Sequence, residues 1–237
     1  MSFSLDKVVP WGRTYEEYIA MFCLDEQDLQ KEILGCGDGP ASFNAEFSKH
    51  GGKIVSIDPI YQFAQDEIAQ RTEEARHLIM AQIRANADEQ VWGQGIDSPD
   101  HLEQIRVTAM SVFLADYLQG KKAGRYIPAA LPKLDFSDRK FGLALCSHFL
   151  LHYAEQLDLD FHLTSLRELC RVADEVRVFP ILELGAKRSR HVDPVVARLS
   201  AEGYKVSIQR VGYEFIKGGN EMLIVKPSLR AITLLPQ

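Results

Sequence analysis

The feature that most constrains this chain is a short apolar segment, EIL, that runs directly into Gly35, Gly37 and Gly39. The next apolar segment, KIVSID, ends on an acid, Asp58. Glycines allow a backbone turn to approach a ligand without a Cβ in the way, and an acid at the end of the following strand can accept hydrogen bonds from ribose hydroxyls. The spacing therefore predicts a nucleotide-like cofactor between the turn and the strand end.

Two other glycine-rich loops fit the sequence less well. A dinucleotide-binding loop has the spacing G-x-G-x-x-G, whereas the sixth position here is Pro40. A P-loop ends in Gly-Lys-Ser/Thr, which is absent from this turn. A nicotinamide or flavin cofactor, and a glycine turn without any ligand, stay as less favoured alternatives.

Strand and helix patterns alternate along the chain. The segments EIL, KIVSID, RYIPAAL, FGLALCSHF and EVRVFPIL predict five strands, with helical periodicity between most of them. Such alternation predicts a doubly wound, mostly parallel α/β sheet. The stretch YKVSIQRVGYEFIKGGNEMLIVKP reads as two strands around a turn, which predicts an antiparallel strand at or near one edge.

One connection is longer than a simple crossover needs. Residues 60–120 contain two helical stripes separated by the breaker-rich loop VWGQGIDSPD. We interpret about 64–120 as an inserted helical subdomain that caps the active site, with a dimerisation surface as the alternative. Thr14 and Glu17 have capping-box spacing at the start of a first helix, so we expect residues 1–30 to form a helical lid on a single domain that spans 1–237.

Composition narrows the class of protein. The net charge of -6 argues against a nucleic-acid partner, and the four scattered cysteines form no C-x-x-C pair. No apolar stretch reaches the roughly 18 residues that a membrane span needs, and the N-terminus MSFSLDKVVPW lacks a signal-peptide pattern. We therefore expect a cytoplasmic protein. Nothing in the sequence decides between a monomer and a homodimer.

Three segments, taken in order, resemble one family. GCGDG, VSIDP and LDFSDRKFGLALCSHFL look like the corresponding motifs of class I S-adenosylmethionine-dependent methyltransferases. The resemblance covers most of the chain outside the insertion. It implies a Rossmann-like sheet of seven strands with an antiparallel terminal strand, S-adenosyl-L-methionine as cofactor, and methyl transfer to an acceptor that we expect to be a small molecule rather than a protein.

The resemblance also implies roles for individual residues around the cofactor. Gly35, Cys36 and Gly37 should line its methionine and ribose portions, and Asp58 should hold the ribose hydroxyls. The residues expected near the adenine are Pro59, Ile60, Ala130 and Leu131.

Other residues are implied at the reacting end of the cofactor. Cys146, Ser147 and His148, at the end of the fourth strand, should face the sulfonium and the acceptor. Trp11 and Arg13 precede the first helix, where relatives fold a lid over the cofactor, and Arg13 is suited to the cofactor carboxylate.

The sequence departs from the family pattern at three positions. Ile33 stands where an acid usually precedes the glycine turn, Ala130 where many members carry an acid, and Gly142 where an Asp is common. Two alternatives follow from these departures and from the glycine spacing. One is a non-catalytic S-adenosylmethionine-binding module of the same fold, and the other is a nicotinamide-dependent oxidoreductase.

Two further groups are candidates for chemistry. His148 and His152 are four residues apart in HFLLH, which lacks the Glu of the zinc motif H-E-x-x-H, so we predict no metal site and take His148 as a base or substrate contact. Lys187, Arg188 and Arg190 form the densest basic cluster, and we predict that they contact the substrate.

Overall fold

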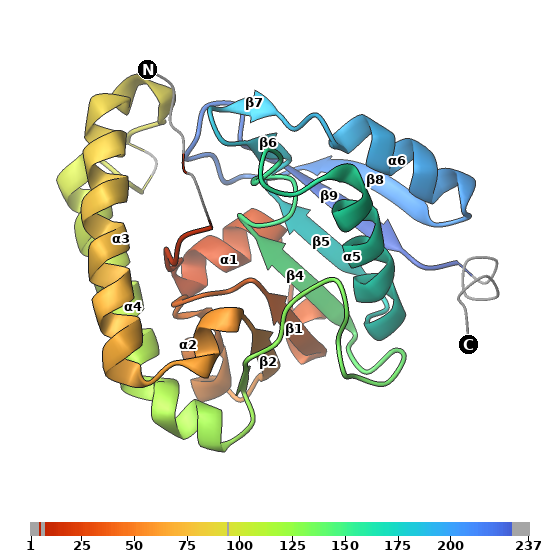
Figure 1. Cartoon of the computed structure of the whole chain (residues 1–237), viewed down its shortest axis with the longest axis horizontal. Helices are drawn as coiled ribbons and strands as arrows, with labels where there is room; N and C mark the ends of the chain where they lie inside the picture. The colour runs from red at the N-terminus through yellow and green to blue at the C-terminus, as the bar shows by residue number, and fades with distance from the viewer. Residues whose placement is uncertain (1–4, 6–7, 94, 229–237) are drawn as a thin grey trace.

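The computed structural model describes residues 5, 8–93 and 95–228. Its centre is a seven-stranded sheet in the order β3-β2-β1-β4-β5-β9-β8 (Figure 1). The strands are β1 (Glu32–Cys36), β2 (Lys53–Ile57), β3 (Tyr126–Ile127), β4 (Leu143–Ser147), β5 (Val176–Phe179), β8 (Lys205–Arg210) and β9 (Glu221–Lys226).

Strand direction confirms the predicted fold class. β1 pairs in parallel with both β2 and β4, and β3 and β5 extend the parallel part on either side. β9 is antiparallel to β5 and to β8, and it lies second from the edge. The chain therefore folds into the expected doubly wound sheet with an antiparallel terminal strand.

Both faces of the central strands β1, β4 and β5 are buried, as parallel strands require. Successive residues of a strand point to opposite faces, so Ile33 packs with α1 (Tyr15–Phe22) and α2 (Phe43–Lys49), whereas Leu34 packs with the helices opposite. Those helices are α5 (Leu159–Val172) and α6 (Val192–Ala201).

The first helix begins as predicted. The Thr14 hydroxyl accepts a hydrogen bond from the Glu17 backbone N–H at 3.1 Å, and the Glu17 carboxylate accepts one from the Thr14 N–H at 2.9 Å. Tyr18 then stacks on Phe43 of α2 with 4.5 Å between ring centroids. α1 is thus one of the helices that cover the sheet, and a short 3-10 turn, Asp28–Gln30, follows it. The lid was predicted over residues 1–30, of which residues 1–4 and 6–7 lie outside the described part of the chain.

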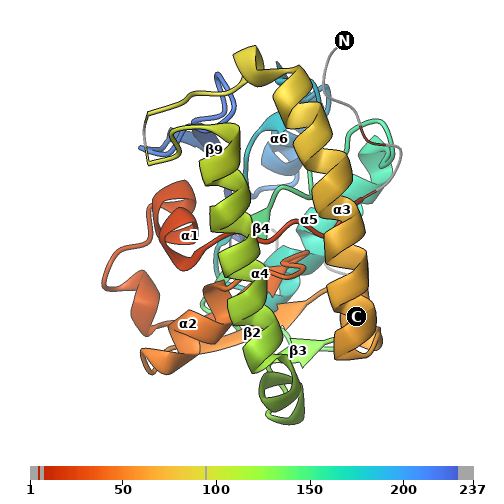
Figure 2. The same ribbon diagram turned by 90° about the vertical axis from the view of Figure 1, so that its left-hand side faces the viewer.

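The connection between β2 and β3 consists of two long helices that run side by side (Figure 2). After the 3-10 turn Pro59–Gln62, α3 spans Gln65–Ala85, a second 3-10 turn spans Ala87–Glu89, and α4 spans Pro99–Lys122. The Ser98 hydroxyl caps α4 by accepting the His101 N–H at 3.1 Å. No helix in the described part of the chain is long and apolar enough to cross a membrane.

A buried ion pair joins this insertion to the first helix. The Arg106 guanidinium on α4 makes two hydrogen bonds to the carboxylate of Glu17, and neither side chain is exposed. Tyr213, in the loop before β9, donates a further hydrogen bond to Glu17 at 2.7 Å. α4 is therefore fixed to the body of the protein through a charged cluster inside it.

Candidate active site

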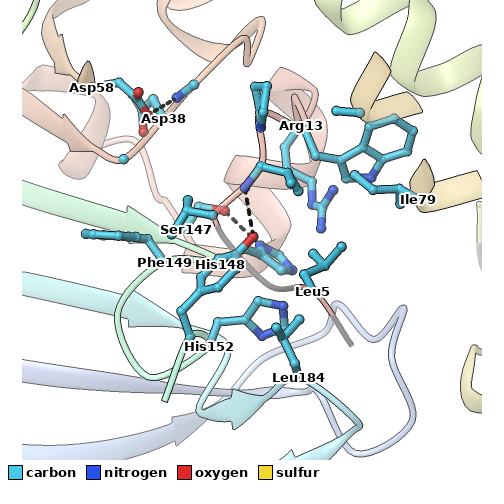
Figure 3. Close-up of a pocket in the computed structure, with 18 of the residues that line it drawn as sticks. Leu5, Arg13, Asp38, Asp58, Ile79, Ser147, His148, Phe149, His152 and Leu184 are labelled. Atoms are coloured by element: carbon cyan, nitrogen blue, oxygen red, sulfur yellow. Dashed lines mark hydrogen bonds between the residues drawn. The ribbon is translucent and has the colours of Figure 1, made fainter. Parts of the chain in front are cut away.

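A cavity of about 600 Å³ lies at the carboxyl ends of β1, β2 and β4. This is the point where the strand order reverses, because β2 and β4 lie on opposite sides of β1. Ligands of open α/β sheets bind in the crevice at such a switch point. The insertion and the N-terminal segment contribute part of the cavity wall: Ile79 of α3 lines it (Figure 3), and so do residues 8–11.

The glycine turn and the acid after β2 are bonded to each other. Gly37 and Gly39 have φ values of +66° and +52°, which glycine adopts without steric cost. The Gly39 N–H donates to Asp58 Oδ2 at 3.0 Å, and the Ile60 N–H donates to Oδ1 at 2.8 Å. Each carboxylate oxygen keeps a further lone pair for a ligand in the cavity.

A second carboxylate, that of Asp38, lies beneath the turn. Its oxygens accept hydrogen bonds from the Tyr18 hydroxyl at 2.8 Å and from the Ser56 hydroxyl at 2.5 Å. A Cβ on Gly35 would lie 1.7 Å from Asp38 Oδ2. Gly35 therefore makes room for this carboxylate, and it does not itself line the cavity.

Burial perturbs both carboxyl groups. It raises the pKa of Asp58 to about 6, against which the N–H groups of Ile60 and Gly39 act. It also raises the pKa of Asp38 to about 6, opposed by the hydroxyls of Ser56 and Tyr18. Perturbed carboxyl groups of this kind cluster at functional sites.

The cavity wall also carries a buried cation. Arg13 is 8% exposed, and its Nε and Nη1 have no hydrogen-bond partner among the described residues. Burial lowers its pKa to about 10, and the neighbouring Arg106 acts in the same direction. A buried guanidinium without a partner is costly, so this position is suited to an anionic group of a ligand (Figure 3).

Two histidines follow β4 at the same end of the cavity. The His148 ring nitrogen Nδ1 lies 2.9 Å from the Ser147 hydroxyl, and the backbone of His148 has a φ of +50°, which is unusual outside glycine. The His152 ring centre is 5.4 Å away. Burial and the charge of Arg13 hold the pKa of His148 well below its usual range. Both rings line the cavity.

Most of the predicted cofactor residues meet in this cavity. The predicted residues that line it are Trp11, Arg13, Cys36, Gly37, Asp58, Pro59, Ile60, Ala130, Leu131, Ser147 and His148. Gly35 and Cys146 do not belong to its wall. Cys146 is buried and lies opposite Cys36 in the register of β1 and β4.

The predicted substrate-binding cluster is placed elsewhere. Lys187 and Arg188 form β7, an exposed strand paired only with the short β6 (Leu182–Glu183). Arg188 forms an ion pair with Asp193 at 3.1 Å. Arg190 contacts Glu183 at 2.8 Å. None of the three basic residues lines the cavity.

Other cavity residues escaped the sequence analysis. They include Asp38 and a mainly apolar group contributed by distant segments: Leu5, Val9, Ile79, Phe149, Tyr153, Leu184 and Phe215. The acid inside G-x-G-D-G was a signal for Asp38. No sequence signal marks the apolar residues as cavity residues, because their helical or strand spacing is the same as that of core residues.

Comparison with known proteins adds one relative. No family model matches the chain. The uncharacterized protein MJ0045 of Methanocaldococcus jannaschii is 34% identical over 223 residues, which cover 94% of this chain and 98% of that protein. Identity at this level over nearly the full length of both chains establishes common descent.

Solved structures are similar only at a distance. A magnesium protoporphyrin IX methyltransferase from Synechocystis with bound S-adenosylhomocysteine has a TM-score of 0.48 and 12% identity over 90% of this chain and 81% of its own. A protein named PigF, also with S-adenosylhomocysteine, has a TM-score of 0.46 and 14% identity over 89% of this chain and 61% of its own. The fold assignment therefore rests on the observed sheet itself, which has seven strands in the order β3-β2-β1-β4-β5-β9-β8. The chain belongs to the same family as MJ0045 of M. jannaschii.

Proposed function

We propose that the protein binds S-adenosyl-L-methionine in this cavity and transfers the methyl group to a second small molecule. The observation that carries the proposal is the Asp58 carboxylate, which two backbone N–H groups hold at the carboxyl end of β2, facing the cavity beside the glycine turn. A carboxylate in this place suits the paired hydroxyls of a ribose.

The remaining cavity wall matches the other parts of such a cofactor. Pro59, Ile60 and Leu131 offer apolar surface for an adenine ring. Arg13 offers a buried cation for the carboxylate of the methionine portion, and Ser147 lies at the end of β4, where the sulfonium would be. The bound sulfonium supplies an activated methyl group. The chain's own residues then have to hold the acceptor in line with the methyl–sulfur bond, which lowers the barrier through orientation.

His148 serves in this proposal as a contact for the acceptor. Its ring stays neutral at neutral pH because burial and Arg13 lower its pKa. Neither His148 nor His152 is hydrogen-bonded to a carboxylate in the described part of the chain, so the pairing that makes a histidine a strong base is not present here. We expect orientation to matter more than proton removal.

Calorimetry with three ligands tests the proposal. We expect S-adenosylmethionine and S-adenosylhomocysteine to bind in the micromolar range and a nicotinamide dinucleotide not to bind. Radiolabelled methyl transfer from S-adenosylmethionine into a protein-free cell extract then tests catalysis. Binding of S-adenosylhomocysteine without any transfer would favour a non-catalytic module, and binding of the dinucleotide alone would favour an oxidoreductase.

A further inference from the structure

One part of the same cavity, called the apolar compartment below, is not accounted for by the cofactor residues. Its walls come from α3, from the N-terminal segment and from the loop before β9, and they include Leu5, Val9, Ile79 and Phe215. Leu78 is 49% exposed at its edge. These walls are apolar, whereas the end beside β1 and β2 carries Asp38 and Asp58. The cavity is therefore divided into a polar end and an apolar end.

Few charged side chains line the apolar compartment, and apart from Glu89, which is half-buried next to the loop that carries Phe215, they are exposed or paired. Arg71 and Glu74 are exposed at its edge, and the Arg71 guanidinium lies 3.9 Å from the centre of the Phe63 ring. Glu183 is paired with Arg190. Burying a charged ligand without a partner costs several kcal/mol. The compartment therefore favours an uncharged occupant.

His152 provides a directional polar contact in the cavity wall. Its Nδ1 lies 2.9 Å from the carbonyl oxygen of Leu182. A carbonyl only accepts hydrogen bonds, so Nδ1 carries the proton and Nε2 of the neutral ring carries a lone pair. No described residue donates to Nε2. Burial lowers the pKa of His152 to about 4, which keeps the ring in this neutral, accepting form.

We propose that the apolar compartment binds the methyl acceptor, and that this acceptor is an uncharged, largely apolar molecule that donates an O–H or N–H hydrogen bond to His152 Nε2. The role of this ligand as a methyl acceptor rests on the proposed function, whereas the binding of such a ligand in the compartment does not. His152 is a positioning residue here. It orients the polar group of the acceptor toward the end of β4, beside His148 (Figure 3).

Three compounds of the same shape test the choice of ligand. Naphthol, methylnaphthalene and naphthoate differ only in carrying a donor, a methyl group or a negative charge. We expect calorimetry on the full-length protein saturated with S-adenosylhomocysteine to show binding of naphthol several-fold tighter than that of methylnaphthalene, because a net hydrogen bond contributes about 1 kcal/mol. Naphthoate should bind at least about tenfold more weakly than naphthol. Equal or tighter binding of naphthoate would overturn the proposal, and so would the absence of naphthol binding.

Variants locate the site. His152→Phe keeps a ring and removes Nε2, so naphthol should lose its advantage over methylnaphthalene while methylnaphthalene still binds. Retained preference for naphthol would exclude His152 as the contact. Leu78→Glu should weaken both compounds, whereas Leu118→Glu, the same change at an exposed position of α4 outside the cavity, should weaken neither. Equal effects of the two Leu→Glu changes would place the compounds elsewhere.

The same experiment separates this inference from the proposed function. If naphthol binds as described but S-adenosylhomocysteine does not bind in a separate titration, the compartment stands and the methyltransferase proposal fails. If S-adenosylhomocysteine binds and displaces naphthol, the two ligands share one compartment and this inference fails alone.

Discussion

The backbone N–H of Gly39 donates a 3.0 Å hydrogen bond to Oδ2 of Asp58. This bond links the turn after β1 to the carboxylate after β2, two parts of the chain that are neighbours only because the strands pair in parallel. A change at either residue therefore disturbs both the turn and the carboxylate.

Asp58→Asn tests the proposed ribose contact. The variant keeps the shape of the side chain but removes the charge, and a hydrogen bond to a charged group is worth about 1.5–3 kcal/mol. We expect S-adenosylhomocysteine to bind roughly 10- to 150-fold more weakly by calorimetry. Asp160→Asn, an exposed change outside the cavity, is the control. Unchanged affinity in Asp58→Asn would remove the main support for the cofactor site.

Arg13→Met tests the proposed contact with the cofactor carboxylate. The substitution removes a buried cation whose Nε and Nη1 have no hydrogen-bond partner among the described residues, so we expect the protein to be about as stable as the wild type. Affinity for S-adenosylhomocysteine should fall at least about tenfold, whereas affinity for adenosine, which lacks the carboxylate, should be unchanged. An equal loss for both ligands would indicate that Arg13 supports the cavity only indirectly.

Stability should depend on pH through Asp38. Burial raises its pKa to about 6, whereas the unfolded carboxyl has a pKa of about 3.9. Between these values the folded protein holds a proton that the unfolded chain has lost, so this group's contribution to stability is full below pH 4 and falls as the pH rises to 6. The loss at neutral pH is on the order of 3 kcal/mol.

Urea denaturation between pH 5 and 7 measures this effect. The free energy of unfolding of Asp38→Asn should decline less steeply with pH than that of the wild type, by up to about 1.4 kcal/mol per pH unit. Asp160→Asn should keep the wild-type slope. Parallel curves for the wild type and Asp38→Asn would show that the Asp38 carboxyl titrates normally.

Much of the fold was predictable from the sequence, and for physical reasons. EIL and KIVSID are short apolar runs; EIL is followed by a glycine and KIVSID is preceded by two. Their short length and the adjacent glycines favour buried strands. The pairing of Thr14 with Glu17 is local, and the structure confirms it. β3 is shorter than RYIPAAL suggests, because only Tyr126–Ile127 pairs with β2 before the chain leaves the sheet.

The candidate site was only partly predictable. Asp58 and Gly37 lie on the strand ends that the topology brings together, so their positions follow from the fold. The basic cluster at Arg188 and Arg190 follows β5 in sequence, but a tight β6–β7 hairpin turns these side chains toward acidic neighbours. Phe215 reaches the cavity from a loop far along the chain, and no local pattern distinguishes it from core residues.

Gly35→Ala should destabilise the protein through Asp38. The added Cβ would lie 1.7 Å from a carboxylate oxygen that Ser56 already fixes. Overpacking of this kind costs typically 1–3 kcal/mol. Gly212→Ala is the control, since nothing lies within 4 Å of its Cβ position. Thermal melting should show a lower midpoint for the first variant only, and equal midpoints would mean that Asp38 moves without cost.

Arg106→Met, a change at a fully buried position of the insertion, should strongly lower the free energy of unfolding. It leaves the buried Glu17 carboxylate without its cation, a loss of about 3–5 kcal/mol. Burial alone would raise the pKa of Glu17, yet the pair with Arg106 lowers it to about 2. Adding Glu17→Gln should recover part of the stability in urea denaturation.

Arg84→Met is the matched control for Arg106→Met. Arg84 on α3 pairs with Glu103 on α4, and the Arg84 side chain is 46% exposed; ion pairs at exposed positions contribute about 0–1 kcal/mol. A similar loss of stability in both variants would show that the buried position of Arg106 has no special weight.

The carboxylate of Glu17 is shared by a helix at the start of the chain, a helix in the insertion and a loop near the last strand. A chimaera that exchanged the insertion between two members of this family would thus have to bring matching partners from both ends of the polypeptide. Three segments that lie far apart in the sequence therefore depend on one buried carboxylate for their packing.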